Sequence, residues 1–546
     1  MGARSGPALA QLRLAQLASA QARSTGADLS ESAAIVDDRL TRRRVLQGAG
    51  VAALALAVPA GRPTPARAAA GSDKRVVIVG GGIAGLGCAY RLWHRHGIRS
   101  HVYEWAQRPG GRIRTLRGHF DDDQLVEEHG EFINPEHTVT LALAKHFGLG
   151  LDNCDRYPPG PSPDQETFRF HGRHWPQADV NRDWHRFGYQ LFKNAAVHKA
   201  PWPTTYRHSS QWGRRYDAMS VREWLDAYLP GGGASDFGQL CISAVLDEYG
   251  GPAEEQSSLN LVYLLGGDAS TNSGLQPRSA PQLGGADEKW HVHGGNDQLI
   301  TGILDRLPAG TLHLDERLVA LREHGNGRVT CSFSSDHRIK DVVADHVVLA
   351  LPFTTLREVD TARVAIGPLH RRAIREEPLG SNAKFFLQYS RRVWDEHHRT
   401  GNAYTRGNVQ GSWDATGYQP GRAGVLAALP GGHIGQDWGS RYGLHHHRGR
   451  PPERMVRDYL ASFEQLFPGS RSAYNGKAFF VWSSGDPHIR GAYSYLKVGQ
   501  YTAFNGLQGR REGRLHFAGE HTSVNFQGYI EGALRSGHRC ADEIVS

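Results

Sequence analysis

The chain has 546 residues, 66 of them glycine, which is enough for two or three domains with a large buried core and is typical of a loop-rich α/β protein. Its net charge is +8, but nine arginines against four acidic residues place +5 of this charge in residues 1–70, which leaves +3 for residues 71–546. Since the body of the chain also has no basic run interleaved with aromatic residues, composition and charge exclude a nucleic-acid partner.

The arginines of the first 70 residues belong to the pattern of an export signal. Arg42, Arg43 and Arg44 precede an apolar run from Gly48 to Val58, and prolines and small-residue cleavage sites follow it. Such a segment makes a secretory signal, and the paired arginines resemble a twin-arginine signal. We therefore expect residues 1–70 to be an extension that the twin-arginine machinery recognises, with the protein secreted or kept in the cell envelope. The run is too short to span a bilayer and no other stretch is long enough, so we expect no stable membrane anchor.

Five cysteines are scattered along the chain, and none has a C-x-x-C or other metal-binding spacing. They are expected to be buried thiols rather than a disulfide framework. The run from His445 to His447 lies among arginine and glycine residues, which favours an exposed loop. No metal site is expected.

A dinucleotide-binding motif begins at residue 76. The apolar run Val76–Val79 meets Gly80, Gly82 and Gly85 in the G-x-G-x-x-G spacing, a small-residue helical pattern follows, and a second apolar segment ends at Glu104. In this motif the first glycine makes the tight turn, the second lets the backbone approach a pyrophosphate, and the third lets helix pack on strand. Glu104 is placed to accept hydrogen bonds from a ribose.

The residues around this motif distinguish flavin from nicotinamide. The helix begins at Ile83 and Ala84, where free N–H groups can meet phosphate. The later turn Gly110-Gly111-Arg112-Ile113-Arg114-Thr115 can bring Arg112 onto the pyrophosphate, since a planar guanidinium binds phosphate oxygens bidentately. This stretch resembles the flavin-containing amine oxidases, whose FAD motif continues into a G-G-R-x-x-T segment. The resemblance implies FAD as the cofactor and an α/β fold, with a discontinuous Rossmann-like FAD-binding domain and an α+β substrate domain carrying a helical insertion.

The C-terminal region is similar to the closing motif of the same family. A strand pattern at Leu515–Phe517 leads into a turn at Gly519 and Glu520, and a later glycine-containing turn opens an amphipathic tail that ends near Val545. By resemblance, Glu520 holds the ribityl chain of FAD. The resemblance adds further cofactor contacts at Gly528, Ile530 and Glu531, at Gly130, Glu131 and Phe132, and at Leu318, whose strand reads adenine.

The resemblance, together with the pattern of predicted elements, implies how the two domains alternate along the chain. Residues 74–135, 287–360 and 476–546 are assigned to the FAD-binding domain, and residues 136–286 and 361–475 to the substrate domain. The predicted helices are Thr138–Phe147, Trp184–Ala195, Val221–Tyr228, Asp236–Tyr249, Ser258–Leu265, Asp297–Leu307 and Pro452–Phe467. The predicted strands include a hairpin at Thr167–Trp175 and segments at Leu312–Leu314, Leu318–Leu321, Val329–Phe333, His346–Leu351 and Ala383–Tyr389.

The resemblance also implies the reaction. A neutral amine gives its α-hydrogen to the flavin, the imine hydrolyses to an aldehyde and ammonia, and dioxygen takes up the electrons as hydrogen peroxide. Lys384 matches the family lysine that reaches the flavin through a water, although from the residues alone a lysine extending to solvent fits equally well. Tyr493 and Tyr529 match the aromatic walls that guide the amine.

Two positions depart from better-known relatives. Mammalian monoamine oxidases attach FAD to a cysteine one residue before the first wall tyrosine; this chain has Ala492 there, so we expect non-covalent FAD. The arginine that binds the substrate carboxylate in many L-amino-acid oxidases falls at Ile133, which cannot bind a carboxylate, although Arg490 lies close enough in sequence to Tyr493 to replace it.

Several alternatives to an amine oxidase stay open at this level. They are an L-amino-acid oxidase giving a 2-oxo acid, ammonia and hydrogen peroxide, an isoprenoid or porphyrinogen desaturase, and a flavin-bound protein without catalysis. The sequence leaves open the identity of the amine or amino acid, the electron acceptor, and whether the protein forms a homodimer.

Overall fold

The computed structural model describes residues 74–154, 164–266, 288–336 and 338–546 of the chain. The predicted export signal lies outside the described residues, so it stays a prediction. None of the helices in these ranges is long and apolar enough to cross a membrane. All five cysteines fall inside the described ranges and none of them forms a disulfide, as expected.

A five-stranded parallel sheet joins distant parts of the chain. Its strands, in spatial order, are β21 (Leu515–Phe517), β13 (His346–Leu349), β1 (Val76–Val79), β2 (Ser100–Tyr103) and β9 (Leu312–His313). The central strands β1 and β13 and the edge strand β21 are short, largely apolar runs with every side chain buried, as expected of a parallel sheet covered on both faces. The predicted strands at these positions are therefore confirmed, with ends that differ by one or two residues.

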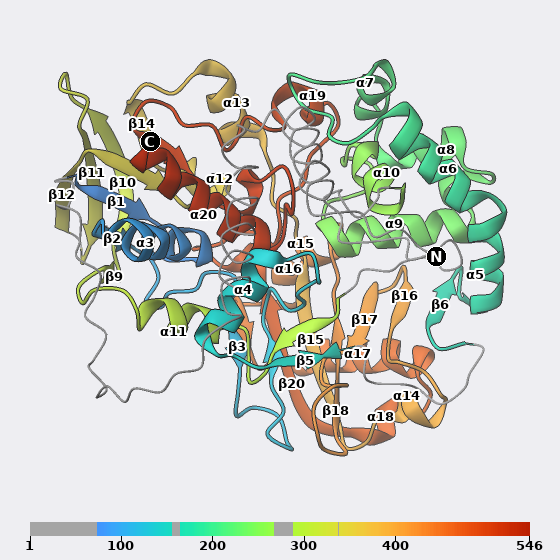
Figure 1. Ribbon diagram of the computed structural model, residues 1–546. Coiled ribbons are helices and arrows are strands. Elements are labelled where there is room, and N and C mark those ends of the chain that lie inside the picture. The colour runs from blue at the N-terminus through green and yellow to red at the C-terminus, as the bar shows by residue number, and fades with distance from the viewer. Residues whose placement is uncertain (1–73, 155–163, 267–287, 337) are drawn as a thin grey trace, which may run out of the picture. The chain divides into compact units, whose positions relative to one another are not determined.

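The first and last helices of the described chain pack against each other beside this sheet (Figure 1). Helix α3 (Ile83–His96) follows β1, and helix α20 (Ile530–Val545) ends the chain. The contact is close because it uses glycine: a Cβ at Gly537 would lie 2.1 Å from the carbonyl oxygen of Ala84. Helices α4 (Thr138–Phe147) and α11 (Gln298–Leu304) contribute to the same apolar core.

A four-stranded sheet accompanies this unit. It consists of β12 (Arg338–Ala344), β11 (Val329–Ser335), β10 (Arg317–Glu323) and β14 (Asp360–Arg363), with α12 (Phe353–Leu356) and α13 (Pro368–Glu376) following in the chain. Two-stranded ribbons pair β3 (Thr115–Leu116) with β4 (Val126–Glu127) and β5 (Leu151–Asn153) with β8 (Trp290–Val292).

An eight-stranded sheet forms the second large layer. Its order is β19 (Arg448–Gly449), β20 (Tyr474–Trp482), β15 (Ala383–Tyr389), β18 (Gly424–Ala428), β17 (Gly411–Asp414), β16 (Ala403–Thr405), β6 (Thr167–Phe170) and β7 (Arg173–His174). Strand β15 lies between β20 and β18, and all seven of its side chains are buried. Helix α17 (Glu453–Leu466) covers one face, with Tyr459 stacked on Phe385 at 4.3 Å between ring centroids.

A group of helices accompanies the eight-stranded sheet and is shown in green at the right of Figure 1. They are α5 (Gln177–Asp183), α6 (Tyr189–Lys193), α7 (Gln211–Asp217), α8 (Val221–Tyr228), α9 (Asp236–Tyr249) and α10 (Ser258–Gly266). The shorter helices elsewhere are α14 (Val393–Glu396), α15 (Gly432–Gln436), α16 (Trp438–Tyr442), α18 (Ser470–Ala473) and α19 (Gln500–Phe504). The helix predicted at Trp184–Ala195 is interrupted by π-helical turns at Trp184–Gly188 and Asn194–Lys199.

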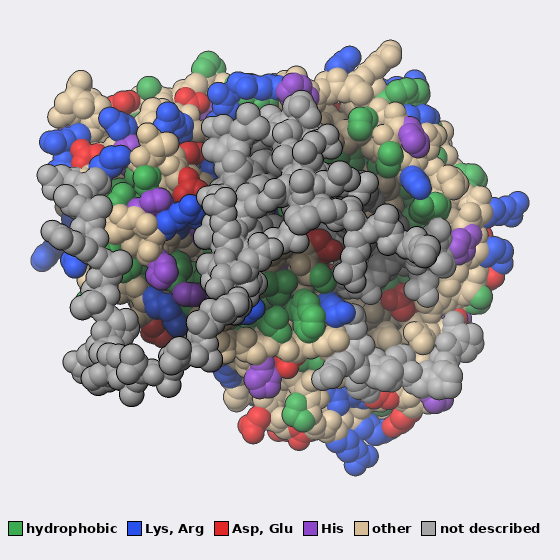
Figure 2. Space-filling view, viewed as in Figure 1, with side chains coloured by type: hydrophobic (Ala, Val, Ile, Leu, Met, Phe, Trp, Pro, Cys, Tyr) green, Lys and Arg blue, Asp and Glu red, His purple; other side chains and the backbone are tan. Residues whose placement is uncertain are grey.

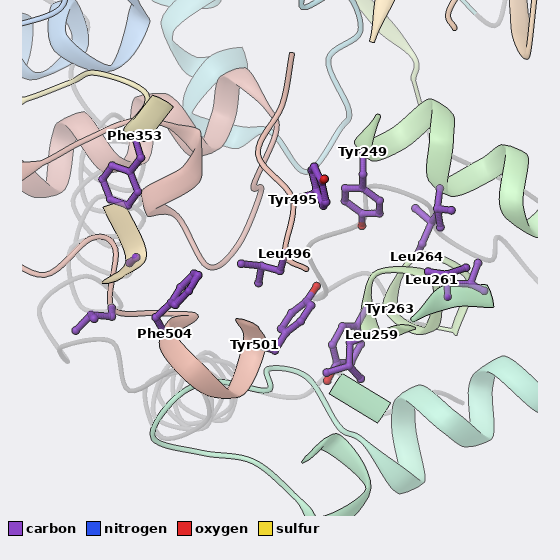
Figure 3. Close-up of a cluster of buried hydrophobic side chains, with 14 of the residues drawn as sticks. Tyr249, Leu259, Leu261, Tyr263, Leu264, Phe353, Tyr495, Leu496, Tyr501 and Phe504 are labelled. Atoms are coloured by element: carbon purple, nitrogen blue, oxygen red, sulfur yellow. The ribbon is translucent and has the colours of Figure 1, made fainter. Parts of the chain in front are cut away.

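One buried cluster ties these helices to the C-terminal part of the chain. Tyr249 at the end of α9 and Tyr263 of α10 belong to it together with Tyr495, Leu496 and Tyr501 (Figure 3). Side-chain caps from serine begin α8 and α9, and the N-cap of α8 is a complete capping box. The serine cap fixes the start of α9, and the packing of Tyr249 fixes its end. This end matters because acidic residues precede Tyr249.

Candidate active site

A cavity of about 1570 Å³ runs between these layers and is lined by residues from the parallel sheet, the eight-stranded sheet and helix α9. The predicted site residues that line it are Gly80, Gly82, Ile83, Ala84, Glu104, Arg112, Gly130, Glu131, Phe132, Leu318, Lys384, Tyr493, Glu520, Gly528, Tyr529 and Ile530. Gly85 and Glu531 do not line it.

The three motif glycines have three different surroundings. Gly80 has φ +109°, and a Cβ there would lie 2.4 Å from the carbonyl oxygen of Ala350. A Cβ at Gly85 would lie 2.0 Å from the carbonyl oxygen of Gly80. A Cβ at Gly82, by contrast, would meet no atom within 4 Å. The first and third glycines are therefore needed for packing, and the second leaves open space on the cavity wall at the start of α3, where a pyrophosphate would lie.

Glu104 is held at the cavity wall by the backbone. Its Oε2 accepts from Gly81 N at 2.6 Å and its Oε1 accepts from Ala106 N at 2.7 Å. Burial raises the pKa of Glu104, although these two hydrogen bonds oppose the shift. Each carboxylate oxygen can accept a second hydrogen bond, so the group suits a ribose diol.

Arg112 and Glu520 join the N-terminal and C-terminal motifs. Arg112 Nη1 donates to Glu520 Oε1 at 3.0 Å and to the carbonyl oxygen of Ala492. Nε and Nη2 of Arg112 have no hydrogen-bond partner within the part of the chain that the structure describes, which leaves donors for a phosphate. Burial alone would raise the pKa of Glu520, but Arg112 and nearby hydrogen bonds lower it. Its two oxygens already accept from Ser494 N, Ser494 Oγ and Gly528 N as well as from Arg112, so Glu520 secures the cavity wall.

Glu531, predicted at the cofactor, lies elsewhere. It is fully buried and accepts from Val139 N, from Thr140 N and Oγ1, and from Arg535. These donors lie at the first turn of α4 and within α20, so Glu531 caps α4 and joins the two helices. The sequence pattern missed this because the acceptor and its donors are separated by nearly 400 residues.

This end of the cavity offers donors and an acceptor that fit FAD. The donors are the free N–H groups at the start of α3, beside the open space at Gly82, and the unused N–H groups of Arg112. The acceptor is the fixed carboxylate of Glu104. Leu318 lines the cavity beside this set, at the position predicted to face adenine.

Lys384 is enclosed at the other end of the cavity. It is 5 % exposed, and its Nζ donates to Glu131 Oε2 at 2.7 Å, to His129 O at 2.8 Å and to Glu127 O at 3.1 Å. The remaining oxygen of Glu131 accepts from Trp413 Nε1 at 2.9 Å. The side chain therefore does not extend to solvent. The carboxylate of Glu131 stabilises the buried ammonium group.

The two predicted wall residues come together at this end. A Cβ at Gly528 would lie 3.5 Å from the Cβ of Tyr493, so Tyr493 lies directly beside the residue that precedes Tyr529. Tyr529 OH donates to Glu248 Oε1 at 2.7 Å, and its ring lies edge-on to His137 with centroids 5.0 Å apart. Burial raises the pKa of both phenols, so both stay neutral.

Three acidic residues that the sequence analysis did not identify line the same end of the cavity: Asp247, Glu248 and Glu288. Burial raises the pKa of Glu248 to about 7 and that of Asp247 well above its usual range. Among the described residues, no lysine, arginine or histidine nitrogen lies within 4 Å of these carboxylates. One signal was available, because adjacent acids in the last turn of a helix oppose its macrodipole. Nothing in the sequence pattern pointed to Trp413, whose Nε1 donates to Glu131.

Neither position considered for a substrate carboxylate faces the cavity. Ile133 is fully buried in the core beside α4, and its backbone pairs with Trp290. Arg490 forms an ion pair with Glu358 and donates to the carbonyl oxygen of Pro487. It does not line the cavity.

Comparison with known proteins identifies the family to which the chain belongs. Residues 83–545 match the family model for flavin-containing amine oxidoreductases. The chain is 24% identical over 495 residues to amine oxidase [flavin-containing] B of Canis lupus familiaris, covering 86% of each chain, and 25% identical over 506 residues to the Homo sapiens protein of that name.

Solved structures of similar fold include a wild-type putrescine oxidase bound to putrescine, with 19% identity, a TM-score of 0.71 and coverage of 87% of this chain and 99% of the other. Cyclohexylamine oxidase from Brevibacterium oxydans IH-35A has 22% identity, a TM-score of 0.71 and coverage of 87% and 100%. These likenesses confirm the predicted fold class. The chain belongs to the flavin-containing amine oxidoreductase family and is an FAD-dependent amine oxidase.

Proposed function

We propose that the protein oxidises a primary amine to an imine that hydrolyses to an aldehyde and ammonia, with dioxygen reduced to hydrogen peroxide. The observation that carries this proposal is the set of acidic side chains that line the cavity near Lys384. Asp247, Glu248 and Glu288 line it, and Lys384 is already paired with Glu131. The raised pKa values of these carboxyls show that their ionised forms lack a cation, and an ammonium group would supply one. A substrate carboxylate would find no such partner among them, so this end favours an amine over an amino acid.

FAD, when bound, accepts the α-hydrogen of the amine with its electron pair and passes two electrons on to dioxygen. The residues of the chain hold and shield these partners. The start of α3 and Arg112 would bind the pyrophosphate and Glu104 a ribose, while Tyr493 and Tyr529 would orient the amine between apolar faces. Lys384, held by Glu131, places a fixed ammonium at the cavity wall, where it would assist the reduction of dioxygen.

An L-amino-acid oxidase is the second candidate, and it is distinguished by substrate preference. A substrate carboxylate needs a cation, and neither Ile133 nor the paired Arg490 provides one. We expect phenethylamine and tyramine to exceed L-phenylalanine and L-tyrosine in kcat/KM by at least about 100-fold, because burying an unpaired carboxylate costs several kcal/mol. A peroxide-coupled assay measures both series, and a higher value for the amino acids would establish the second candidate.

We also propose that FAD is bound without a covalent link, since Ala492 stands where relatives carry the attaching cysteine. Acid precipitation is then expected to leave the yellow cofactor in the supernatant. Colour retained in the protein pellet would show a covalent bond elsewhere.

Export by the twin-arginine route remains our proposal from residues 1–70. N-terminal sequencing of the extracellular or envelope protein is expected to begin near residue 69 or 71. An intact Met1 outside the cytoplasm would contradict it.

A further inference from the structure

Glu248 occupies a position that the reaction described so far does not use. It lies in the last turn of α9 and lines the cavity together with Tyr493 and Tyr529. Its Oε1 accepts from Tyr529 OH at 2.7 Å. Its Oε2 has no hydrogen-bond partner within the described ranges of the chain. A carboxylate oxygen is therefore available beside a residue that faces the substrate.

The chemistry of amine oxidation needs such a group. A primary alkylamine has a pKa close to that of lysine, about 10.4, so near neutral pH it reaches the protein as an ammonium ion. The ammonium nitrogen has no lone pair, and without one it cannot support loss of hydride from the neighbouring carbon. One proton must leave the nitrogen before the oxidation. Only a small fraction of the amine is neutral in solution near neutral pH, so a side chain in the cavity that accepts the proton makes the abundant ammonium form usable.

The other ionisable groups at this end are less suited to accept a proton. Glu288 lines the cavity, but among the described residues it forms no hydrogen bond to either wall tyrosine, whereas Glu248 does. All three donor positions of Lys384 are used, and Glu131 is ion-paired with Lys384, so a proton on Glu131 would cost that buried pair. Burial raises the pKa of both wall tyrosines, which keeps their hydroxyl protons in place. Asp247 also lines the cavity, but its carboxylate packs onto Gly411 and one of its oxygens is buried without a partner, so protein covers part of that carboxylate.

We propose that Glu248 accepts the proton of the substrate ammonium and so supplies the neutral amine that is oxidised. An N–H bond of the substrate breaks and an O–H bond forms on Glu248, giving a neutral amine and a carboxylic acid with no change of oxidation state. The proton leaves when Glu248 ionises again after product departure. This assignment rests on the proposed oxidation of a primary amine.

The surroundings of Glu248 are consistent with a group that takes up and releases a proton near neutral pH. The titratable groups facing it are Asp247 and Tyr249 on its own helix, and Glu288, Tyr493 and Tyr529 from other segments. Burial raises its pKa to about 7, and the hydrogen bond from Tyr529 opposes that shift. Below this pKa the carboxyl is protonated and cannot accept, so kcat/KM is expected to fall as the pH drops below about 7.

Tyr249 holds Glu248 in place. It is the final residue of α9 and belongs to the buried cluster that contains Tyr495 and Leu496 (Figure 3). Because this anchor is independent of the carboxylate, Glu248→Gln is expected to leave the fold and the bound FAD intact, which absorbance at the flavin bands measures directly.

The test compares pH profiles of kcat/KM for phenethylamine in the wild type, Glu248→Gln and Glu254→Gln. Glu254 is an exposed glutamate that does not line the cavity, so its variant is the matched control and should follow the wild type. Glu248→Gln must use the small neutral fraction of the amine, and it is expected to lose about 100-fold at pH 7 and to recover to within about tenfold at pH 10. A defect in packing would not recover at high pH.

An unchanged acid limb in Glu248→Gln, or a loss of equal size at pH 7 and pH 10, would overturn the proposal. If the glutamine variant does not retain FAD, Glu248→Asp decides, since it keeps a carboxylate. Its acid limb is expected to persist with a lower plateau, and disappearance of the limb would overturn the assignment. A wild type that oxidises no amine would refute the proposed function itself, whereas active wild type with an unchanged variant refutes only the role of Glu248.

Discussion

The two ends of the cavity differ in how their charges are balanced. At the dinucleotide end, Glu104 accepts from two backbone N–H groups and Glu520 is neutralised by Arg112. At the substrate end, Asp247 and Glu248 line the cavity without a cation nearby in the part of the chain that the structure describes, and their pKa values are raised. The first end is built to bind one ligand in a fixed geometry, and the second to respond to protons and to a positively charged substrate. Changes at the two ends should therefore give different phenotypes.

The largest effect is expected from Lys384→Met. It leaves Glu131 as an unpaired charge in a buried site, where side-chain exposures are 6% for Lys384 and 4% for Glu131. We expect a loss of about 3–5 kcal/mol in the free energy of unfolding and a fall of about 100-fold or more in the rate of flavin turnover. The double variant Lys384→Met with Glu131→Gln should regain most of the stability but not the rate. Normal reduction and reoxidation rates in a Lys384→Met protein that keeps FAD would remove the proposed role.

A matched pair of glycine substitutions separates packing from cofactor binding at the other end. Gly80→Ala is expected to cost about 1–3 kcal/mol in folding, because φ is +109° and the new Cβ would meet Ala350. Gly82→Ala has φ −74° and free space around the new Cβ, so it should cost less than about 1 kcal/mol. It should nevertheless raise the Kd for FAD by about tenfold or more. Thermal unfolding of the apoprotein and flavin titration measure the two effects, and equal FAD affinity in Gly82→Ala would contradict the placement of the pyrophosphate.

The smallest effect is expected from Tyr529→Phe, which sharpens the assignment at the substrate end. The variant keeps the aromatic wall and removes only the hydrogen bond to Glu248. Since that bond lowers the pKa of Glu248, its loss should move the acid limb of kcat/KM to higher pH, with less than about a tenfold change on the plateau. A limb that moves to lower pH would contradict the direction of this coupling. Tyr206→Phe changes a tyrosine outside the cavity and serves as the control.

Lysine, arginine and acidic side chains are interspersed over the face seen in Figure 2 and do not gather in one basic patch there. The acidic residues on which the proposals rest line the cavity instead, a placement that the composition of the chain could not indicate.

The sequence by itself determined the cofactor end. The glycine spacing, the strand and helix around it and Glu104 act within about thirty residues, and local backbone geometry enforces their roles. Long periodic segments such as Thr138–Phe147 and Asp236–Tyr249 were predicted to the residue, because the apolar period and the helix boundaries are local signals. Strands β17 and β20 were not predicted, since their pairing partners lie far away in the chain.

At the substrate end, the sequence suggested Lys384, Tyr493 and Tyr529 by resemblance, and only the tertiary structure decided which residues surround them. It paired Glu131 with both Lys384 and Trp413, placed Glu248 against Tyr529, and showed that Glu531 caps α4. The partners in these contacts are separated by more than 250 residues, and no local preference specifies them. Their energy depends on burial, because a charge or hydroxyl shielded from water requires a partner in space wherever that partner lies in the sequence.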